Sequence, residues 1–219
     1  MKAVVRAVCA VLFVIPSFLP AVQARAQVTA VAPATEAPQY NNRWEIYGGL
    51  QYSHFNPSPG RNVQANNLLG WNGTATIYLH PSWGIEGGVR GLYGSMSVPA
   101  NPYGVEANPK MSETLFLFGP TFRLRRRENY AAGLHADVGG AYGSFDNDFP
   151  PGVSPNQVGI YNNKLAFAGT IGAWYDYNLS PRLSVRTILD YQLTRYGYKR
   201  QNEFAGSVGV VYKFGTLRK

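Results

Sequence analysis

From residue 43 onward, apolar and polar residues alternate with a period of two, in runs separated by Pro, Gly, Asn and Ser. The eight runs span residues 43–55, 68–80, 83–96, 112–125, 130–145, 163–179, 183–197 and 202–214. Successive side chains of a strand point to opposite faces, so each run predicts a strand with one apolar and one polar face. No long segment of this region has helical periodicity, and the pattern therefore predicts an all-β domain.

The connections between these runs fall into two classes of length. Those at 81–82, 126–129 and 180–182 are tight, and the last connection, around 198–200, is short. The connections 56–67, 97–111 and 146–162 are long and contain paired prolines. One end of the sheet thus has three tight turns and both termini, and the other has three long loops. This asymmetry is typical of outer-membrane barrels, whose turns are periplasmic and whose loops are extracellular.

Either face of these strands could be the one in water, because a soluble barrel keeps its apolar face inside and a membrane barrel inverts that order. Three features favour the membrane barrel. Aromatic residues of the apolar face gather near the strand ends, as in the two girdles of membrane barrels. The polar face is rich in Gly, Ala, Ser and Thr and has few charges, and the runs exceed the ~9–11 residues that a tilted spanning strand needs. We therefore expect a closed, eight-stranded, antiparallel up-and-down transmembrane β-barrel over residues 43–214.

The first 26 residues have the pattern of an export signal peptide. Lys2 and Arg6 precede an apolar stretch, and Ala24-Arg25-Ala26 offers a cleavage site after Ala26, or alternatively after Ala24. The apolar stretch is too short to span a bilayer readily as an uncleaved anchor helix. Residues 27–42 are rich in Ala and Pro and are interpreted as a disordered periplasmic tether. Residues 215–219 form a short C-terminal tail.

The final strand carries the sequence SVGVVYKF, in which Ser207, Gly209, Tyr212 and Phe214 occupy fixed positions of a short pattern. It resembles the C-terminal signal that the bacterial barrel-assembly machinery recognises, although an ordinary closing strand could have the same sequence pattern. With the eight runs, the export signal and the DYQLT segment at 190–194, the chain resembles the small outer-membrane β-barrel family. This family includes the transmembrane domain of outer-membrane protein A and the opacity-type surface proteins. The resemblance implies an outer-membrane location with periplasmic termini and contact with outer-membrane lipids, but not one function.

Charged residues on the polar face are predicted to lie in the lumen, which eight strands make just wide enough for side chains to fill. The inward acids are Glu45, Glu86, Asp137, Asp176, Asp190 and Glu203, and the inward bases are Arg90, Arg123, Arg186 and Lys213, with His135 beside them. The turn at 180–182 sets Asp176 opposite Arg186, and Lys213 and Glu45 follow at the same height. We expect a network of these four residues at the periplasmic end and a second pair, Glu86 with Arg123. The charges could form a plug or a polar path for ions.

Catalysis, metal binding and nucleic-acid binding receive little support from the sequence. The chain has three histidines, and its one cysteine, Cys9, lies in the predicted signal. Of these histidines, His54 lies on the lipid-facing phase near the outer rim, where a lipid-editing base would act, but no nucleophile and acid converge on it. The scattered histidines do not point to a metal site. The net charge of +8 comes without a basic helix or phosphate loop, and the basic run at 123–127 fits charges at a periplasmic turn.

These observations lead to three hypotheses of function. The first is a non-enzymatic surface or envelope protein, monomeric and without cofactor. Its loops 56–67, 97–111 and 146–162 contact an extracellular ligand, or its barrel simply stiffens the membrane. The second is a narrow pore for ions or small solutes. The third is a lipid-modifying enzyme at the outer rim.

Overall fold

The computed structural model describes residues 40–56, 65–162 and 164–217. The strands are β1 (Trp44–Asn56), β2 (Asn66–His80), β3 (Trp83–Ser95), β4 (Lys110–Arg126), β5 (Tyr130–Ser144), β6 (Leu165–Asn178), β7 (Leu183–Thr194) and β8 (Gln201–Phe214). Two short 3-10 helices, η2 (Pro155–Val158) and η3 (Tyr196–Tyr198), lie in the β5–β6 and β7–β8 connections. No helix among these residues is long and apolar enough to cross a bilayer.

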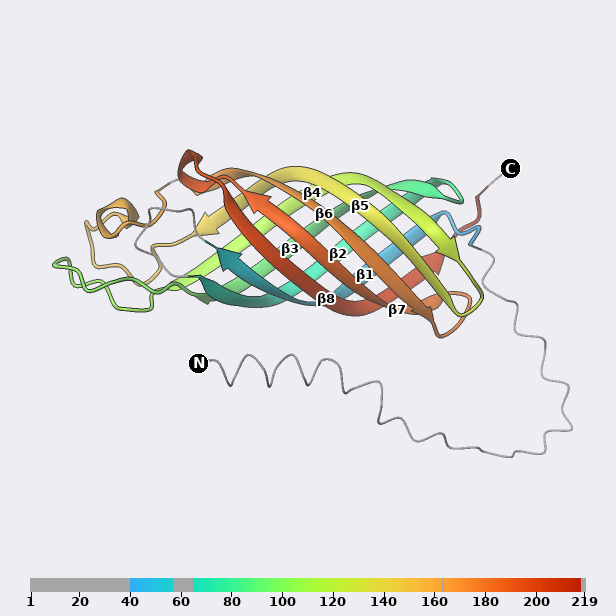
Figure 1. Ribbon diagram of the computed structural model, residues 1–219, viewed down its shortest axis with the longest axis horizontal. Helices are drawn as coiled ribbons and strands as arrows, with labels where there is room; N and C mark the ends of the chain where they lie inside the picture. The colour runs from blue at the N-terminus through green and yellow to red at the C-terminus, as the bar shows by residue number, and fades with distance from the viewer. Residues whose placement is uncertain (1–39, 57–64, 163, 218–219) are drawn as a thin grey trace, which may run out of the picture. The chain divides into compact units, whose positions relative to one another are not determined.

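Each strand pairs antiparallel with its neighbours in the chain, and β8 pairs with β1 to close the barrel (Figure 1). At this seam Glu45 lies opposite Lys213 and Trp44 lies opposite Phe214. Closure gives every strand a partner on both sides, which lipid requires because it offers the backbone no other hydrogen bonds. The predicted closed eight-stranded antiparallel barrel is therefore confirmed.

The outer face of the barrel is apolar over most of its height. Ile46, Leu50, Phe118, Ile171 and Leu189 are all exposed between the two rims. Exposed aromatic residues lie near the strand ends: Trp44, Trp83, Tyr177, Tyr212 and Phe214 at the turn end, and Tyr52, Trp71, Tyr93, Tyr142 and Phe204 at the loop end. Soluble monomers seldom expose so continuous an apolar surface, whereas membrane barrels carry such a band between two aromatic girdles. The apolar face is therefore the one that faces lipid.

The strand ends differ from the predicted ones by up to three residues. The largest shift is in β7, which ends at Thr194 instead of residue 197. Gly197 and Tyr198 have left-handed φ angles of 61° and 60°, which extended strands do not contain. They turn the chain through η3 before β8 begins.

The end of the predicted tether is not disordered, and this part of the prediction is wrong. Tyr40 and Asn42 are buried at the turn end of the barrel. The backbone N–H of Leu217 donates to the carbonyl oxygen of Asn41 at 2.7 Å, so the first residues of the predicted tail pair with the end of this segment. The physical reason is that the charged lumen at this end offers hydrogen-bonding partners to a chain that passes over it.

Several predicted segments lie outside the described residues. They are the signal peptide 1–26 with its cleavage site at Ala24 or Ala26, the tether from 27 to 39, the tip 57–64 of the first long loop, and residues 218–219 of the tail.

Candidate functional site

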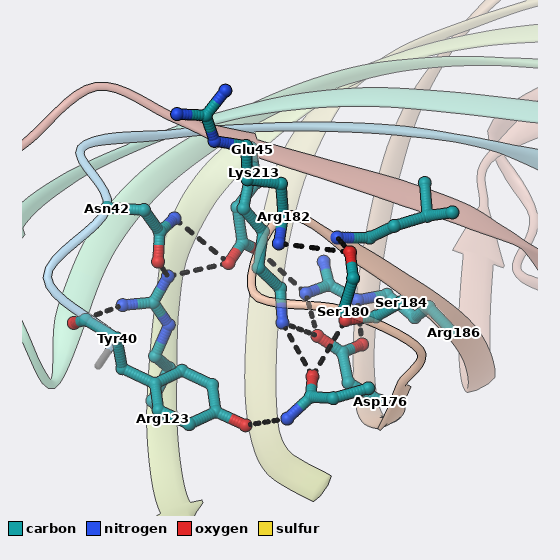
Figure 2. A network of polar contacts seen from close by, with 12 residues as sticks. Tyr40, Asn42, Glu45, Arg123, Asp176, Ser180, Arg182, Ser184, Arg186 and Lys213 are labelled. Carbon is teal, nitrogen blue, oxygen red and sulfur yellow. Dashed lines mark hydrogen bonds and ion pairs between the residues drawn. The ribbon is translucent and has the colours of Figure 1, made fainter. Parts of the chain in front are cut away.

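The turn-end half of the lumen contains a network of charged side chains centred on Arg186 of β7 (Figure 2). Its guanidinium lies between two carboxylates: Nε is 2.6 Å from Asp176 Oδ1, and Nη2 is 2.7 Å from Glu45 Oε2. Lys213 Nζ lies 3.5 Å from Asp176 Oδ2. The structure thus brings together the four residues that the sequence predicts as a network. All four are almost completely buried.

Strand register explains this arrangement. The tight turn after β6 sets Asp176 directly opposite Arg186, and the closing seam sets Glu45 opposite Lys213. The indole ring of Trp174 supports the centre of the network, with the Arg186 guanidinium 4.4 Å from its ring centroid. Because each carboxylate has a cationic partner, the desolvation cost of burying these charges is offset locally.

Residues 40–42, which precede β1, complete the network at the turn end of the lumen. Arg123 of β4 donates to Glu45 Oε1 at 2.6 Å and to Asn42 Oδ1 at 2.9 Å. The same guanidinium also donates to the backbone oxygen of Tyr40, which lies beside Arg123 in Figure 2. The Tyr40 hydroxyl donates to the carbonyl oxygen of Arg127 at 2.9 Å. The polar network therefore extends to residues that the sequence analysis assigned to a tether.

The predicted pair of Glu86 with Arg123 does not form. The β3–β4 register sets Glu86 opposite Gly119, four residues away from Arg123, which pairs with Glu45 instead. The two strands are joined by the long loop 97–111, whose length leaves their register undetermined in the sequence. The prediction failed for that reason.

A second cluster, in the middle of the lumen, surrounds His135 of β5. Its Nδ1 lies 2.7 Å from Glu86 Oε1 and 3.8 Å from Asp137 Oδ2, while its Nε2 lies 2.6 Å from Asp190 Oδ1. Arg90 pairs with the other oxygen of Asp190 at 2.6 Å. These are the remaining inward charges of the prediction except Glu203, and the sequence did not predict that they would meet.

The loop-end half of the lumen contains two buried carboxylates, and the sequence analysis missed one of them. Glu203 accepts hydrogen bonds from Ser53 at 2.8 Å and Gln192 at 2.9 Å. Glu113 accepts one from the Tyr196 hydroxyl at 3.0 Å. Burial and the neighbouring Glu113 raise the pKa of Tyr196. Glu113 could have been found from its sequence, because it shares the odd-numbered inward phase of Arg123 on the same strand.

An apolar cluster fills the rest of the loop-end half. From the strands it includes Phe55, Leu68, Leu92 and Leu115, and from the connections it includes Val98, Val105, Phe145, Val158, Ile160 and Tyr161. The Phe145 ring contacts those of Tyr161 and Tyr196, at centroid distances of 5.8 and 5.0 Å. Two of the long loops therefore fold onto the barrel end and close it.

The two other histidines lie apart from these clusters. His54 Nδ1 lies 2.8 Å from Asn67 Oδ1 on the outer side of the barrel, and His80 Nδ1 accepts the backbone N–H of Ser82 at the β2–β3 turn. These contacts fit polar residues at the membrane interface and at a turn. In the basic run 123–127, Arg123 is buried and the following arginines are exposed at the β4–β5 turn.

The residues of the C-terminal pattern are divided between the two faces of β8. Ser207 faces the lumen and shares a hydrogen bond of 2.7 Å with Tyr47, whereas Tyr212 and Phe214 are exposed and stack on each other. A Cβ at Gly209 would collide with the backbone of Gly48 across the seam. Gly209 therefore has a structural role in bringing β8 close to β1.

Comparisons with known proteins agree with this architecture. No protein-family model and no curated protein sequence matches the chain. Neisserial surface protein A (NspA) superposes with a TM-score of 0.52 at 11% identity, covering 78% of this chain and 97% of that one. The chain has the fold of the small outer-membrane β-barrels.

Two further small outer-membrane barrels align over a similar length. OprG from Pseudomonas aeruginosa and Ail, the attachment invasion locus protein of Yersinia pestis, are each 16% identical with TM-scores of 0.49. Each match covers 80% of this chain, with 97% of OprG and 99% of Ail. The 11% identity with NspA establishes the fold alone. The apolar exterior band of this barrel suits a place in a membrane.

Proposed function

We propose that this protein is a non-enzymatic, non-conducting outer-membrane barrel whose structured loops present an interaction surface outside the cell. The observation that carries the proposal is the packing of loop residues into the barrel end. Val98, Val105, Val158, Ile160 and Tyr161 are all buried in one cluster with barrel side chains. Loops anchored in this way hold a fixed shape, which is what recognition of a partner needs.

The proposal assigns the tight turns and the chain termini to the periplasm, and the long loops to the exterior. This orientation follows the general asymmetry of outer-membrane barrels. The barrel would be monomeric, with lipid around its apolar band and the assembly machinery recognising β8 during insertion. The exposure of Tyr212 and Phe214 beside the seam is compatible with such recognition.

A narrow pore is the second candidate, and one observation favours it. The side-chain amides of Gln51 and Asn72, in the middle of the lumen, are buried without hydrogen-bond partners among the described residues. Buried amides of this kind are usually satisfied by internal water. Water in the middle of the lumen is the first requirement for conduction.

Planar-bilayer conductance of the folded full-length chain separates the two candidates. We expect no discrete current steps, because the charge network closes one end of the lumen and the apolar cluster closes the other. Reproducible unitary steps from protein shown to be folded would contradict the proposal and favour the pore. A variant lacking residues 98–105 and 147–161 loses Val98, Val105, Val158, Ile160 and Tyr161 of the apolar cluster and keeps every strand. Current steps from this variant alone would show that those loop residues close the loop end.

The surface role is tested by site-specific photo-crosslinking in whole cells. A photoreactive residue at Tyr103, which is exposed in the loop 97–111, should give adducts with a partner macromolecule. The matched control is the same residue at Tyr142, in the outward aromatic girdle, which should crosslink only to lipid. Identical lipid adducts at both positions would contradict a loop-mediated role.

The hypothesis of a lipid-modifying enzyme is tested by a separate measurement on the membrane lipids. We expect His54→Ala to leave the lipid composition of the outer membrane unchanged by mass spectrometry. A lost lipid modification in this variant would replace the present proposal with a lipid-modifying activity.

A further inference from the structure

The described lumen holds more buried acids than bases. Seven carboxylates are buried there, against four cationic side chains and His135. The turn-end network has an excess of cations, so the deficit lies in the middle and loop-end parts. Buried carboxylates without compensating charge are costly, and either protons or bound cations must reduce that cost.

The middle cluster is the part of the lumen that combines this deficit with ligands for a metal. One ligand atom from each of Glu86, His135 and Asp137 lies within 4.8 Å of the other two. The ligands come from β3 and β5, two strands held in fixed positions by the closed sheet. Rigid strands suit a metal site because they fix the ligands before the ion arrives.

Two further features distinguish this cluster from a simple group of acids. Asp137 is only 4% exposed, its Oδ1 has no hydrogen-bond partner, and its Oδ2 faces His135 Nδ1. On the far side of the ring, Asp190 lies 2.6 Å from Nε2 and is itself held by Arg90. A carboxylate behind a histidine is the usual arrangement that orients a metal-binding imidazole.

We propose that Glu86, His135 and Asp137 bind a divalent transition-metal ion inside the barrel, with Asp190 positioning the His135 ring. Both ring nitrogens of His135 lie at hydrogen-bond distance from carboxylates. With the ion on Nδ1, the Nε2–H of the neutral ring donates to Asp190. The cluster then holds three carboxylates, Arg90 and a divalent ion, and its charges balance.

The ligand set indicates which ions the site prefers. One imidazole nitrogen with two carboxylate oxygens suits Zn²⁺ and related first-row ions better than Mg²⁺ or Ca²⁺, which prefer oxygen alone. Water can supply a fourth ligand. An ion at this position would tie β3 to β5 and act as a structural crosslink within the barrel.

The test is titration of the folded full-length chain in detergent with Zn²⁺, followed by calorimetry and by X-ray absorption at the zinc edge. We expect one ion per chain, with a single nitrogen and otherwise oxygen in its coordination shell. Asp137→Asn should weaken binding by at least tenfold, because it replaces an anionic ligand by an amide of the same shape. Asp190→Asn should weaken it by about 10–100-fold, as is usual for residues that orient a ligand.

Two control variants keep the result specific. Glu113→Gln removes a buried lumen carboxylate outside the cluster and should leave Zn²⁺ affinity unchanged. The double change His54→Gln and His80→Gln removes both other histidines and should also leave it unchanged. If Asp137→Asn does not fold, Glu86→Gln tests the same site, with folding checked by the gel mobility of unheated and heated samples.

Each outcome decides the proposal. Stoichiometric binding that depends on Asp137 or Glu86 and shows one nitrogen ligand supports it. Absence of stoichiometric binding by the folded wild type overturns it. Protons on the carboxylates, instead of a bound cation, would then reduce the excess negative charge. Binding that survives both ligand changes, or that disappears in the histidine control, also overturns it.

Discussion

The two halves of the lumen are filled in different ways, although the same eight strands form both. At the turn end, Arg186, Arg123 and Lys213 pair with Glu45 and Asp176. At the loop end, apolar side chains from strands and connections form one cluster, with Glu113 and Glu203 buried at its border. The first half is held by charge pairing and the second by exclusion of apolar surface from water.

This difference follows from what each end can use to close the lumen. The tight turns contribute few side chains, so the turn end is filled by long charged side chains of the strands and by the segment at 40–42. The long connections bring in apolar residues, so the loop end is closed like the core of a soluble domain. The two halves should therefore respond differently to the same kinds of substitution.

Arg186→Ala should have the largest effect, lowering the free energy of unfolding by about 3–5 kcal/mol. The change leaves the carboxylates of Asp176 and Glu45 buried with fewer cationic partners. A buried charge without its partner destabilises the folded state strongly. The measurement is the urea midpoint of the protein in detergent or lipid. Arg182→Ala, an exposed arginine at the neighbouring turn, is the control and should leave the midpoint in place. Equal midpoints for the two variants would contradict the network.

Ile160→Ala should lower the free energy of unfolding by about 2–5 kcal/mol, because Ile160 is completely buried and its removal leaves a cavity in the loop-end cluster. It should also make the loops 97–111 and 146–162 more sensitive to added protease. Tyr103→Ala, at an exposed position of the loop 97–111, should change neither quantity. Unchanged protease sensitivity in the Ile160 variant would show that the cluster does not hold the loops.

Tyr40→Phe should lower the free energy of unfolding by about 0.5–1.5 kcal/mol. The change removes the hydroxyl that donates to the Arg127 carbonyl and accepts from Asn178 at 2.5 Å. Tyr103→Phe is the matched control. If both tyrosine changes have the same effect, the segment before β1 does not contribute to closing the turn end.

Glu113→Gln should have the smallest effect, keeping the free energy of unfolding within about 1 kcal/mol of the wild-type value. No destabilisation is expected, because this carboxylate has no cationic partner among the described residues. The glutamine can still accept the hydrogen bond from Tyr196. Glu45→Gln, the same substitution in the charge-paired half, should instead destabilise clearly. Similar destabilisation by both changes, measured as urea midpoints, would remove the distinction between the two halves.

The sequence was sufficient to predict the barrel and, inside it, the charge network at the turn end. Alternation along each run identified the strands and their lipid-facing sides, because a period of two fixes the face of every residue. The turn at 180–182 is short enough to set register, so the contact between Asp176 and Arg186 followed by counting. Glu113 was within reach of the same reasoning, since its phase matches that of Arg123.

The remaining contacts depended on tertiary structure. Long connections leave strand register open, and for that reason Arg123 could not be assigned to Glu45 rather than to Glu86. Which loop residues enter the lumen is equally invisible in a pattern of prolines and polar residues. His135 meets Glu86 and Asp190 only because β3, β5 and β7 face one another across the closed barrel.

Local periodicity and short connections were enough to predict the closed barrel, its two faces, the excess of inward acids and the charge pair set by a tight turn. How the lumen is closed and which of its charges meet emerged from the three-dimensional fold. Those features arise between strands that are distant in the chain, where side-chain length, register and burial act together.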